Sequence, residues 1–335
     1  MPAADPRLIL PEPPDALKAL SRDLVARMRE RHQQAGRLSF SDYMEMALYE
    51  PGLGYYSAGL PKLGEDGDFV TAPELGTLFA RCLARQLSDI AGALDTGAEH
   101  KGLNEEGAGQ GEHSKGELDS GWVLLELGAG TGRLAADLLN ALLEADAPMP
   151  GRYLILERSA DLRAEQERVI RARAPAHAQR VAWLDAPPVA PWRGVLIANE
   201  VIDGDTPGWT TWPANQTLSE RVTALQERLP EPLSTDGYRS ELCLTLPGWL
   251  DTVTNKLTQG AALFIDYGYP RPVYYHPERR DGTLVCHYRH RGHFDPFFWP
   301  GLQDLSAFVD FTALAEAADQ AGLEVTGYTP QNQFL

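Results

Sequence analysis

The fold is decided by the stretch Leu124-Leu125-Glu126-Leu127-Gly128-Ala129-Gly130-Thr131-Gly132-Arg133. Residues 123–127 form a short, mainly apolar run, which predicts a buried parallel strand. The run breaks into a loop with three glycines, and leucines then recur at helical spacing over residues 134–142. A strand, a glycine turn and a helix in this order bring backbone N–H groups and a helix N-terminus up to a ligand. We therefore expect an α/β fold with a ligand at this loop.

The spacing of the glycines favours one class of nucleotide ligand over another. The dinucleotide fingerprint is G-x-G-x-x-G, whereas here the third glycine comes one residue early and Arg133 stands at the dinucleotide position. Glu126, an acidic residue, lies two positions before the first glycine. Its negative charge suits the cationic sulfonium and α-amino groups of S-adenosylmethionine (SAM) better than it suits NAD. SAM is the favoured ligand, with a dinucleotide or a purely structural turn as alternatives. The candidate cofactor-binding residues in this stretch are Glu126, Gly128, Ala129, Gly130, Thr131 and Gly132.

The composition excludes several classes of protein. The 335 residues are 43% hydrophobic, which is enough for one large α/β domain with additions or for two small domains. The net charge is −17 and no basic stripe stands out, so no nucleic acid is expected as a partner. Three widely separated cysteines indicate a reducing compartment without disulfides.

The sequence shows no recognisable targeting segment. No apolar run approaches the roughly 18 residues that a membrane-spanning helix needs, so no membrane partner is expected. The first 14 residues are rich in proline and contain acidic residues, unlike a signal peptide or an Arg-rich transit peptide. We therefore expect a cytoplasmic protein.

The first 91 residues predict an N-terminal helical and lid region. Apolar residues at helical spacing predict helices over 16–31, from about 40 to 48 and over 75–91. Ser39 or Ser41 is the expected cap of the second helix. The loops between the last two helices are rich in glycine, aromatic and acidic residues. They are interpreted as a lid over substrate or cofactor, with an ordinary surface loop as the alternative.

The remainder of the chain divides into an insertion and a core. Residues 92–121 hold many glycines and acidic residues and almost nothing apolar, which is typical of a disordered acidic insertion. Residues 122–335 form the predicted SAM-binding core. Within the core, the pattern over about 206–260 suggests inserted short strands on the substrate side, such as residues 241–246.

Acidic residues follow two further predicted strands of the core. The strand over 153–156 ends in Glu157, where nucleoside-binding α/β folds place an acid that accepts hydrogen bonds from the ribose hydroxyls. The strand over 180–184 is followed by Asp185, at a position that commonly meets the adenine edge. Both are candidate cofactor-binding residues, and a helix cap or a surface position is the alternative for each.

Polar residues gather at the end of the predicted strand over 194–203, and strand ends bind ligands in open α/β sheets. A carboxylate there can clamp a guanidinium by bidentate hydrogen bonds and hold it against a methyl donor. Glu200 is the first candidate catalytic residue, Asp203 the second, and Asp266, after the strand over 261–265, the third. Asn199 is a candidate cofactor-binding residue. A role in capping the next helix is the alternative.

The segment Cys286-His287-Tyr288-Arg289-His290-Arg291-Gly292-His293 invites a metal assignment, but its spacing matches no standard zinc pattern. We expect no metal, and interpret these aromatic and basic side chains as the lining of a substrate cleft. Further along, residues 308–321 predict a helix and residues 323–328 a late strand.

The chain resembles the MidA family of class I SAM-dependent methyltransferases. The resemblance spans nearly the whole sequence, from residues 36–40 to residues 333–335. Several motifs carry it, and together they are far more specific than a glycine loop. They are Tyr49-Glu50-Pro51-Gly52-Leu53-Gly54-Tyr55-Tyr56, Gly67-Asp68-Phe69-Val70-Thr71-Ala72-Pro73-Glu74, Glu126-Leu127-Gly128-Ala129-Gly130-Thr131-Gly132, Ala198-Asn199-Glu200-Val201-Ile202-Asp203, Ile265-Asp266-Tyr267-Gly268-Tyr269 and Val309-Asp310-Phe311-Thr312.

The resemblance implies a Rossmann-like class I methyltransferase sheet with an N-terminal helical and loop extension and inserted β-rich elements. The family's eukaryotic member symmetrically dimethylates an arginine on a respiratory complex I subunit. The resemblance therefore implies protein arginine methylation linked to respiratory complex assembly, with a protein that presents an arginine as partner. A homodimer stays open. The implied SAM-binding residues are Gly128, Gly130, Gly132 and Glu157, with Thr71, Pro73 and Glu74 in a loop that closes near the ligand.

Three other functions stay open beside SAM-dependent methylation of protein arginine. A small-molecule methyltransferase would methylate a metabolite pool with no protein present. An assembly factor without turnover would bind SAM yet never yield S-adenosyl-homocysteine. A nicotinamide oxidoreductase is the third, and the early third glycine argues against it.

Overall fold

The computed structural model describes residues 10–59, 77–101, 121–199, 214–233 and 237–334. The chain divides into two compact units, each assembled from separated stretches of sequence. The sheet unit comprises Thr71–Val201, Gly248–Ile265 and Ala321–Leu335, and the accessory unit comprises Met1–Val70, Ile202–Pro247 and Asp266–Gln320.

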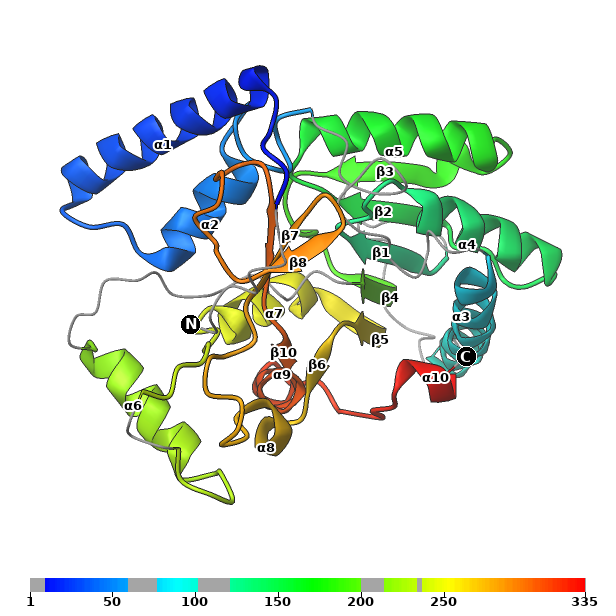
Figure 1. Ribbon diagram of the computed structural model, residues 1–335. Helices are drawn as coiled ribbons and strands as arrows, with labels where there is room; N and C mark the ends of the chain where they lie inside the picture. The colour runs from blue at the N-terminus through cyan, green and yellow to red at the C-terminus, as the bar shows by residue number, and fades with distance from the viewer. Residues whose placement is uncertain (1–9, 60–76, 102–120, 200–213, 234–236, 335) are drawn as a thin grey trace. The chain divides into compact units, whose positions relative to one another are not determined.

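The sheet unit is built on a five-stranded sheet in which every neighbouring pair is parallel (Figure 1). Its strand order is β3-β2-β1-β4-β5, so the order reverses between β1 and β4. Such a reversal creates a crevice at the carboxyl ends of the strands, where open α/β sheets bind their ligands. The predicted Rossmann-like fold is confirmed. The strands are β1 (Val123–Leu127), β2 (Arg152–Leu156), β3 (Val181–Leu184), β4 (Trp192–Asn199) and β5 (Leu257–Ile265).

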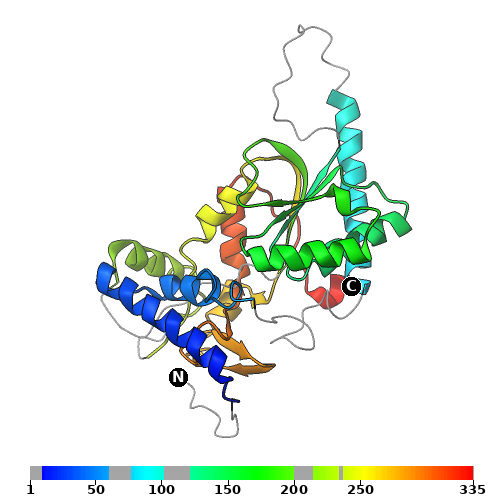
Figure 2. The ribbon, with the colours of Figure 1, turned by 90° about the horizontal axis from the view of Figure 1, so that it is seen from above.

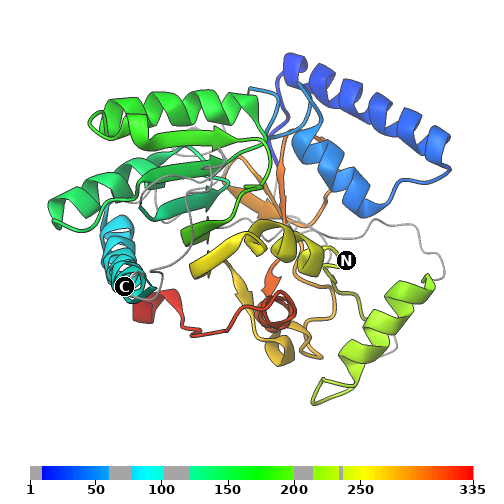
Figure 3. The same cartoon turned by 180° about the vertical axis from the view of Figure 1, so that it is seen from behind.

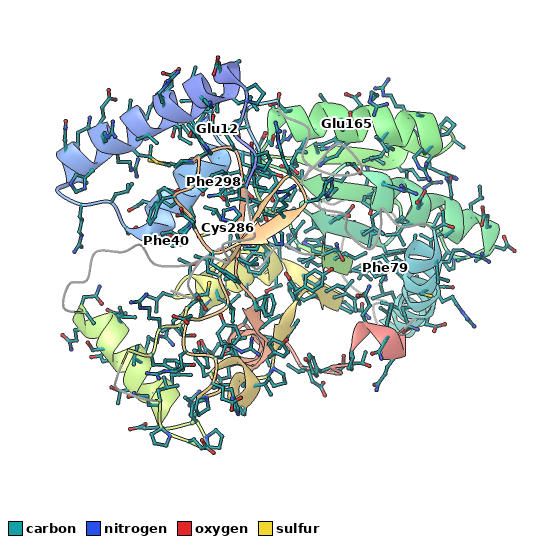
Figure 4. All side chains as sticks on the ribbon, in the orientation of Figure 1. Glu12, Phe40, Phe79, Glu165, Cys286 and Phe298 are labelled. Atoms are coloured by element: carbon teal, nitrogen blue, oxygen red, sulfur yellow. The ribbon has the colours of Figure 1, made fainter. Side chains whose placement is uncertain are left out.

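Helices pack on this sheet (Figure 2). Together with the sheet they bury the main apolar cluster of the unit. Leu134, Leu138, Leu139 and Leu142 recur along one face of α4 and are all buried, as their spacing predicts. Helix α3 packs against α4 and contributes further side chains to the cluster, including Phe79 (Figure 4). The helices of this unit are α3 (Leu78–Lys101), α4 (Arg133–Glu144), α5 (Ala160–Arg173), most of α7 (Leu246–Thr254) and α10 (Gln331–Phe334).

Helix α3 corrects the predicted start of the disordered insertion. It continues to Lys101, so the first ten residues of the stretch 92–121 are helical. Leu94 is only 4% exposed and belongs to the apolar cluster of the sheet unit. The helix thus packs a leucine into the core from a segment whose average composition indicates disorder. Residues 102–120 lie outside the described part of the chain.

The accessory unit begins with two helices that pack together (Figure 3). Ser39 caps the second of them by accepting a hydrogen bond from Asp42 N at 3.0 Å, so one of the two expected caps is confirmed. Side chains from this helix form an apolar cluster with β7, to which Phe40 and Cys286 contribute (Figure 4). The helices of the unit are α1 (Asp15–Ala35), α2 (Phe40–Tyr49), α6 (Gln216–Gln226), α8 (Arg271–Tyr274) and α9 (Phe311–Gln320).

The small strands of this unit lie later in the sequence than predicted. A three-stranded antiparallel sheet has the order β8-β7-β9, and β6 pairs with β10 in parallel. The described part of the stretch 206–260 instead contains α6, α7 and the core strand β5. The late strand expected over 323–328 is also absent, because those residues form no regular element. The small strands are β6 (Gly268–Tyr269), β7 (Val285–Tyr288), β8 (Arg291–His293), β9 (Asp304–Ser306) and β10 (Val309–Asp310).

A buried carboxylate explains why residues 241–246 do not form the expected strand. Glu241 accepts hydrogen bonds from Thr283 N at 2.9 Å and from Leu284 N at 3.2 Å. A Cβ on Gly282 would lie 2.1 Å from Glu241 Oε1, so only glycine allows the carboxylate to come this close. These hydrogen bonds anchor Glu241 to the residues just before β7. Residues 241–246 therefore form no strand, although polar and apolar residues alternate along them.

An ion-pair network joins the short helices of the accessory unit. Arg271 in α8 is buried and donates to both carboxylate oxygens of Glu316 in α9, at 2.7 and 2.6 Å. Its Nε lies 3.3 Å from Asp310 Oδ2, and Arg228 donates to Glu316 at 2.8 Å. Burial of a charge is costly unless it is paired, so this network fixes α8 and α9 to β10. Burial raises the pKa of Asp310, whereas the Arg271 hydrogen bond lowers the pKa of Glu316.

Candidate cofactor-binding site

The glycine loop follows β1 and has the backbone conformation that its sequence requires. Gly128, Gly130 and Gly132 have φ values of 60°, 52° and 81°, in the left-handed region that glycine adopts without a steric penalty. Gly132 then caps α4, whose N-terminus therefore begins at the loop. Loops of this kind present backbone N–H groups to a ligand. The predicted strand, turn and helix are confirmed, and the binding role of the loop residues stays a prediction.

Glu126 lies inside the sheet unit, not on an open acidic rim. Its side chain is 2% exposed, and it accepts a hydrogen bond from Tyr153 OH at 2.7 Å. Burial, and to a smaller extent the charge of Glu157, raise the pKa of Glu126 to about 7, against the lowering effect of the Tyr153 hydrogen bond. The expectation that Glu126 faces a cationic ligand at the surface needs this correction, because alternation along β1 turns the side chain towards Tyr153.

The raised pKa of Glu126 predicts how stability depends on pH. A carboxyl group with a raised folded-state pKa binds its proton more tightly when folded, so its stabilising effect is complete below its unfolded pKa. That contribution is lost as the pH rises from about 4.5 through about 7. We expect Glu126→Gln, which keeps an acceptor for Tyr153, to remove this loss. The difference in unfolding free energy between variant and wild type should change by up to about 3 kcal/mol between pH 5 and pH 8.

Urea denaturation of both proteins at several pH values measures this difference. Glu241 and Asp310 also have pKa values raised by burial, but their effects cancel when the variant is compared with the wild type at each pH. Glu157 acts on Glu126 through its charge, so its coupling to Glu126 is part of the measured difference. A difference in unfolding free energy that stays constant with pH would contradict the assignment to Glu126.

Glu157 stands at the carboxyl end of β2, as predicted, and is held by the protein itself. Its carboxylate accepts hydrogen bonds from Ser159 N at 2.9 Å and from Gln166 Nε2 at 3.0 Å. Burial raises its pKa, and these hydrogen bonds partly offset that effect. The carboxylate is therefore fixed in orientation before any ligand arrives.

The arginine Arg163 connects Asp185 to the same end of the sheet. Its guanidinium donates to Glu157 O and to Leu184 O, the carbonyls at the ends of β2 and β3, the second at 2.8 Å. The same guanidinium lies 2.7 Å from the Asp185 carboxylate, which is 92% exposed. Such an exposed ion pair contributes little stability, so Asp185 stays accessible to a ligand. Its predicted contact with adenine stays a prediction.

Asn199 lies at the carboxyl end of β4 and carries a buried acceptor. Leu127 pairs with Ala198 across β1 and β4, so Asn199 is level with the first residue of the glycine loop. Asn199 Oδ1 is buried and has no hydrogen-bond partner among the described residues. Buried acceptors in native proteins nearly always have a partner, and a bound polar ligand can supply one.

The structure thus brings several predicted cofactor-binding residues to one edge of the sheet, while others cannot be placed. Asp266 directly follows β5 and accepts a hydrogen bond from Tyr267 N at 2.8 Å. Three candidates from the lid loop and two candidate catalytic residues lie outside the described part of the chain: Thr71, Pro73, Glu74, Glu200 and Asp203.

The residue that the sequence analysis missed is Gln166, which bonds to Glu157 and to Gly130 O. It lies on the charged helix α5, where it and Ile170 are the two buried residues. Their separation by four residues marks one helix face. A polar residue in phase with an apolar one was therefore the signal available in the sequence.

Metal binding finds no support in the described residues. Within residues 10–59, 77–101, 121–199, 214–233 and 237–334, no group of three or more His, Cys, Asp and Glu side chains could hold a metal ion. The segment 286–293 forms the β7–β8 hairpin, and burial raises the pKa of the Cys286 thiol. No helix in these ranges is sufficiently long and apolar to span a membrane.

Comparison with known proteins identifies related sequences. The family model described as "Putative S-adenosyl-L-methionine-dependent methyltransferase" matches residues 113–205 and 204–329. The mitochondrial protein arginine methyltransferase NDUFAF7 homolog of Caenorhabditis elegans is 25% identical, over 96% of this chain and 76% of its own length. The mitochondrial protein arginine methyltransferase NDUFAF7 of Mus musculus is 25% identical, over 90% of this chain and 71% of its own length.

A solved structure is similar over almost the whole chain. It is a Burkholderia thailandensis protein in complex with S-adenosyl-homocysteine, 37% identical, with a TM-score of 0.74. The match covers 94% of this chain and 80% of the other. The likeness therefore includes both the sheet unit and the accessory unit.

These relatives correct the expected location. The NDUFAF7 relatives from C. elegans and M. musculus are named as mitochondrial proteins. The prediction of a cytoplasmic protein, made from the absence of a signal or transit segment, was wrong.

Proposed function

The chain belongs to the S-adenosyl-L-methionine-dependent methyltransferase family whose model it matches, and we propose that it transfers the methyl group of SAM to an arginine side chain of a protein. The observation that carries the proposal is the carboxyl edge of the parallel sheet, where the left-handed glycine loop, the fixed carboxylate of Glu157 and Asn199 Oδ1, which has no partner among the described residues, lie at neighbouring strand ends. The similar structure that contains S-adenosyl-homocysteine supports the choice of ligand.

The residues at this edge fit SAM by their chemistry. The backbone of residues 128–132 would hold the amino-acid part, Glu157 the ribose hydroxyls and Asp185 the adenine edge. Asn199 Oδ1 can accept a hydrogen bond from a ligand amino group. Thr71, Pro73 and Glu74 are proposed to close over the ligand. SAM supplies an electrophilic methyl group on a sulfonium.

Arginine is the proposed acceptor because two relatives are named protein arginine methyltransferases. A guanidinium has a pKa above about 12 and delocalised lone pairs, so it needs a carboxylate to orient one nitrogen. Glu200 is proposed for this role, with Asp203 and Asp266 as further candidates. The nitrogen gains the methyl group and releases a proton. Symmetric dimethylation and a link to respiratory complex assembly are proposed from the resemblance to the MidA family.

Ligand binding and methyl transfer together test this function. We expect S-adenosyl-homocysteine to raise the melting temperature, because a ligand at a hundredfold over its Kd adds about 2.7 kcal/mol to stability, while NAD has no effect. We also expect radiolabelled methyl groups from SAM to appear on protein arginine when the purified chain is added to a heat-treated lysate. Acid hydrolysis and amino-acid analysis then identify the methylated residue.

The outcomes separate the alternatives. An equal rise in melting temperature with NAD, or no rise with S-adenosyl-homocysteine, would reject SAM as the ligand. Label confined to small molecules would indicate a metabolite methyltransferase. Binding without any release of S-adenosyl-homocysteine from SAM would indicate an assembly factor without turnover.

A further inference from the structure

Gln166 is a fully buried amide that makes three hydrogen bonds. Its relative exposure is 0%. Its Nε2 donates to Gly130 O at 3.0 Å and to Glu157 Oε2 at 3.0 Å. Its Oε1 accepts from Trp183 Nε1 at 2.8 Å. Both amide N–H groups and one lone pair of the oxygen are thus used within the sheet unit.

The orientation of this amide follows from the chemistry of its partners. The indole of Trp183 can only donate, so it must face the amide oxygen. Gly130 O and the ionised Glu157 carboxylate can only accept, so they must face the amide nitrogen. No other orientation satisfies all three partners. Trp183 on β3 therefore fixes the rotamer that directs the two N–H groups to the glycine loop and to Glu157.

The two acceptors are both at the proposed SAM site. Gly130 belongs to the glycine loop, and Glu157 is the proposed partner of the ribose hydroxyls. Helix α5 approaches the loop closely as well, because a Cβ on Gly132 would lie 2.9 Å from Gln166 Cα. One side chain thus links the loop that would hold the amino-acid part of SAM to the carboxylate that would hold its ribose.

We propose that Gln166 is a positioning residue that sets the selectivity of the site for a ribose with both hydroxyl groups. It acts through Glu157, whose Oε2 it holds so that the rest of the carboxylate faces the nucleoside. This inference rests on the proposed SAM-binding function. An apolar residue would remove the hydrogen-bond partner that Gln166 gives to Gly130 O, to Glu157 Oε2 and to the Trp183 N–H, and would leave Glu157 with its Oε1 bond to Ser159 N. An acidic residue would place a second carboxylate beside Glu157.

Binding of two ligands tests the proposal: S-adenosyl-homocysteine and its 2′-deoxy analogue. Wild type should bind the first at least about tenfold more tightly, the scale of a hydrogen bond to a charged group. Gln166→Met, which keeps the length of the side chain, should weaken the binding of S-adenosyl-homocysteine at least about tenfold. It should also reduce the preference between the two ligands to within about threefold. Gln179→Met, at an exposed position before β3, is the matched control and should change neither value.

The ratio of the two affinities separates positioning from a general structural role. A Gln166→Met variant whose affinity falls by the same factor for both ligands, so that the wild-type preference is kept, would overturn the proposal. Failure of the wild type to bind either ligand would instead reject the proposed function. Circular dichroism and a melting curve establish that the variants are folded.

Gln166→Glu provides a second measurement should the methionine variant not fold. Two buried carboxyl groups in contact cannot both ionise easily, so they share a proton at low pH. We expect the affinity of this variant for S-adenosyl-homocysteine, relative to wild type, to rise at least about tenfold between pH 8 and pH 6. A ratio that is constant with pH would overturn the proposal, because a merely structural defect has no reason to follow the ionisation of Glu157.

Discussion

Gly132→Val is expected to abolish detectable binding of S-adenosyl-homocysteine at concentrations that saturate the wild-type protein. A Cβ at this position would lie 2.9 Å from Gln166 Cα, a backbone atom that cannot move without α5. The φ of 81° adds strain of about 1–2 kcal/mol for any residue with a side chain. Both effects displace the end of the loop, where α4 begins.

Gly322→Val is the matched control for this substitution. Gly322 has a φ of 79° and lies in the same unit, but a Cβ there would meet nothing within 4 Å. The control thus carries the same backbone strain without the contact, and it should bind S-adenosyl-homocysteine within about threefold of wild type. Isothermal titration calorimetry measures both variants. Binding by Gly132→Val close to that of wild type would show that the loop tolerates a side chain, and equal loss in both variants would assign the effect to general strain.

Glu200→Gln is expected to reduce methyl transfer at least about a hundredfold while SAM affinity stays near that of wild type. The factor is the scale on which positioned acid–base or electrostatic groups act. The amide keeps the shape of the carboxylate but cannot stabilise the positive charge of the guanidinium. Initial rates with a confirmed methyl acceptor, and SAM binding on the same preparation, measure the two quantities separately.

Glu220→Gln serves as the control for the loss of one carboxylate. Glu220 is exposed on α6 and accepts a hydrogen bond from Gln216 of the same helix at 2.8 Å, so its replacement should leave the rate unchanged. A rate for Glu200→Gln within a few-fold of wild type would remove Glu200 from the mechanism and direct attention to Asp203 and Asp266. Loss of SAM binding would make it a cofactor-binding or structural residue instead.

The parts of the fold that sequence could predict are those in which local pattern and tertiary environment agree. Residues 123–142 combine an apolar run, three left-handed glycines and a helical leucine pattern, and each signal requires the same strand, turn and helix. The position of Glu157 was predictable for the same reason, because Glu157 is the residue immediately after a short apolar strand.

The errors arose where a distant residue decides the outcome. Residues 241–246 alternate like a strand, yet Glu241 is bonded to backbone N–H groups more than forty residues away. Leu94 in α3 packs into the apolar cluster of the sheet unit, a contact that composition averaged over residues 92–121 cannot show. Gln166 was overlooked because its partners come from β3, the glycine loop and the end of β2.

The division of the accessory unit into three separated stretches has a consequence for how the protein is made. Ser21 Oγ donates to Pro300 O and Tyr43 OH to Pro296 O, across 279 and 253 residues of chain. A ribosome therefore releases α1 and α2 long before their partners exist, and closing such long loops slows folding. Until residues 284–305 have been synthesised, the apolar face of α2 lacks side chains that cover it, such as Cys286 and Leu305. We therefore expect fragments that end before β7 to be poorly soluble, and the nascent chain to need a chaperone.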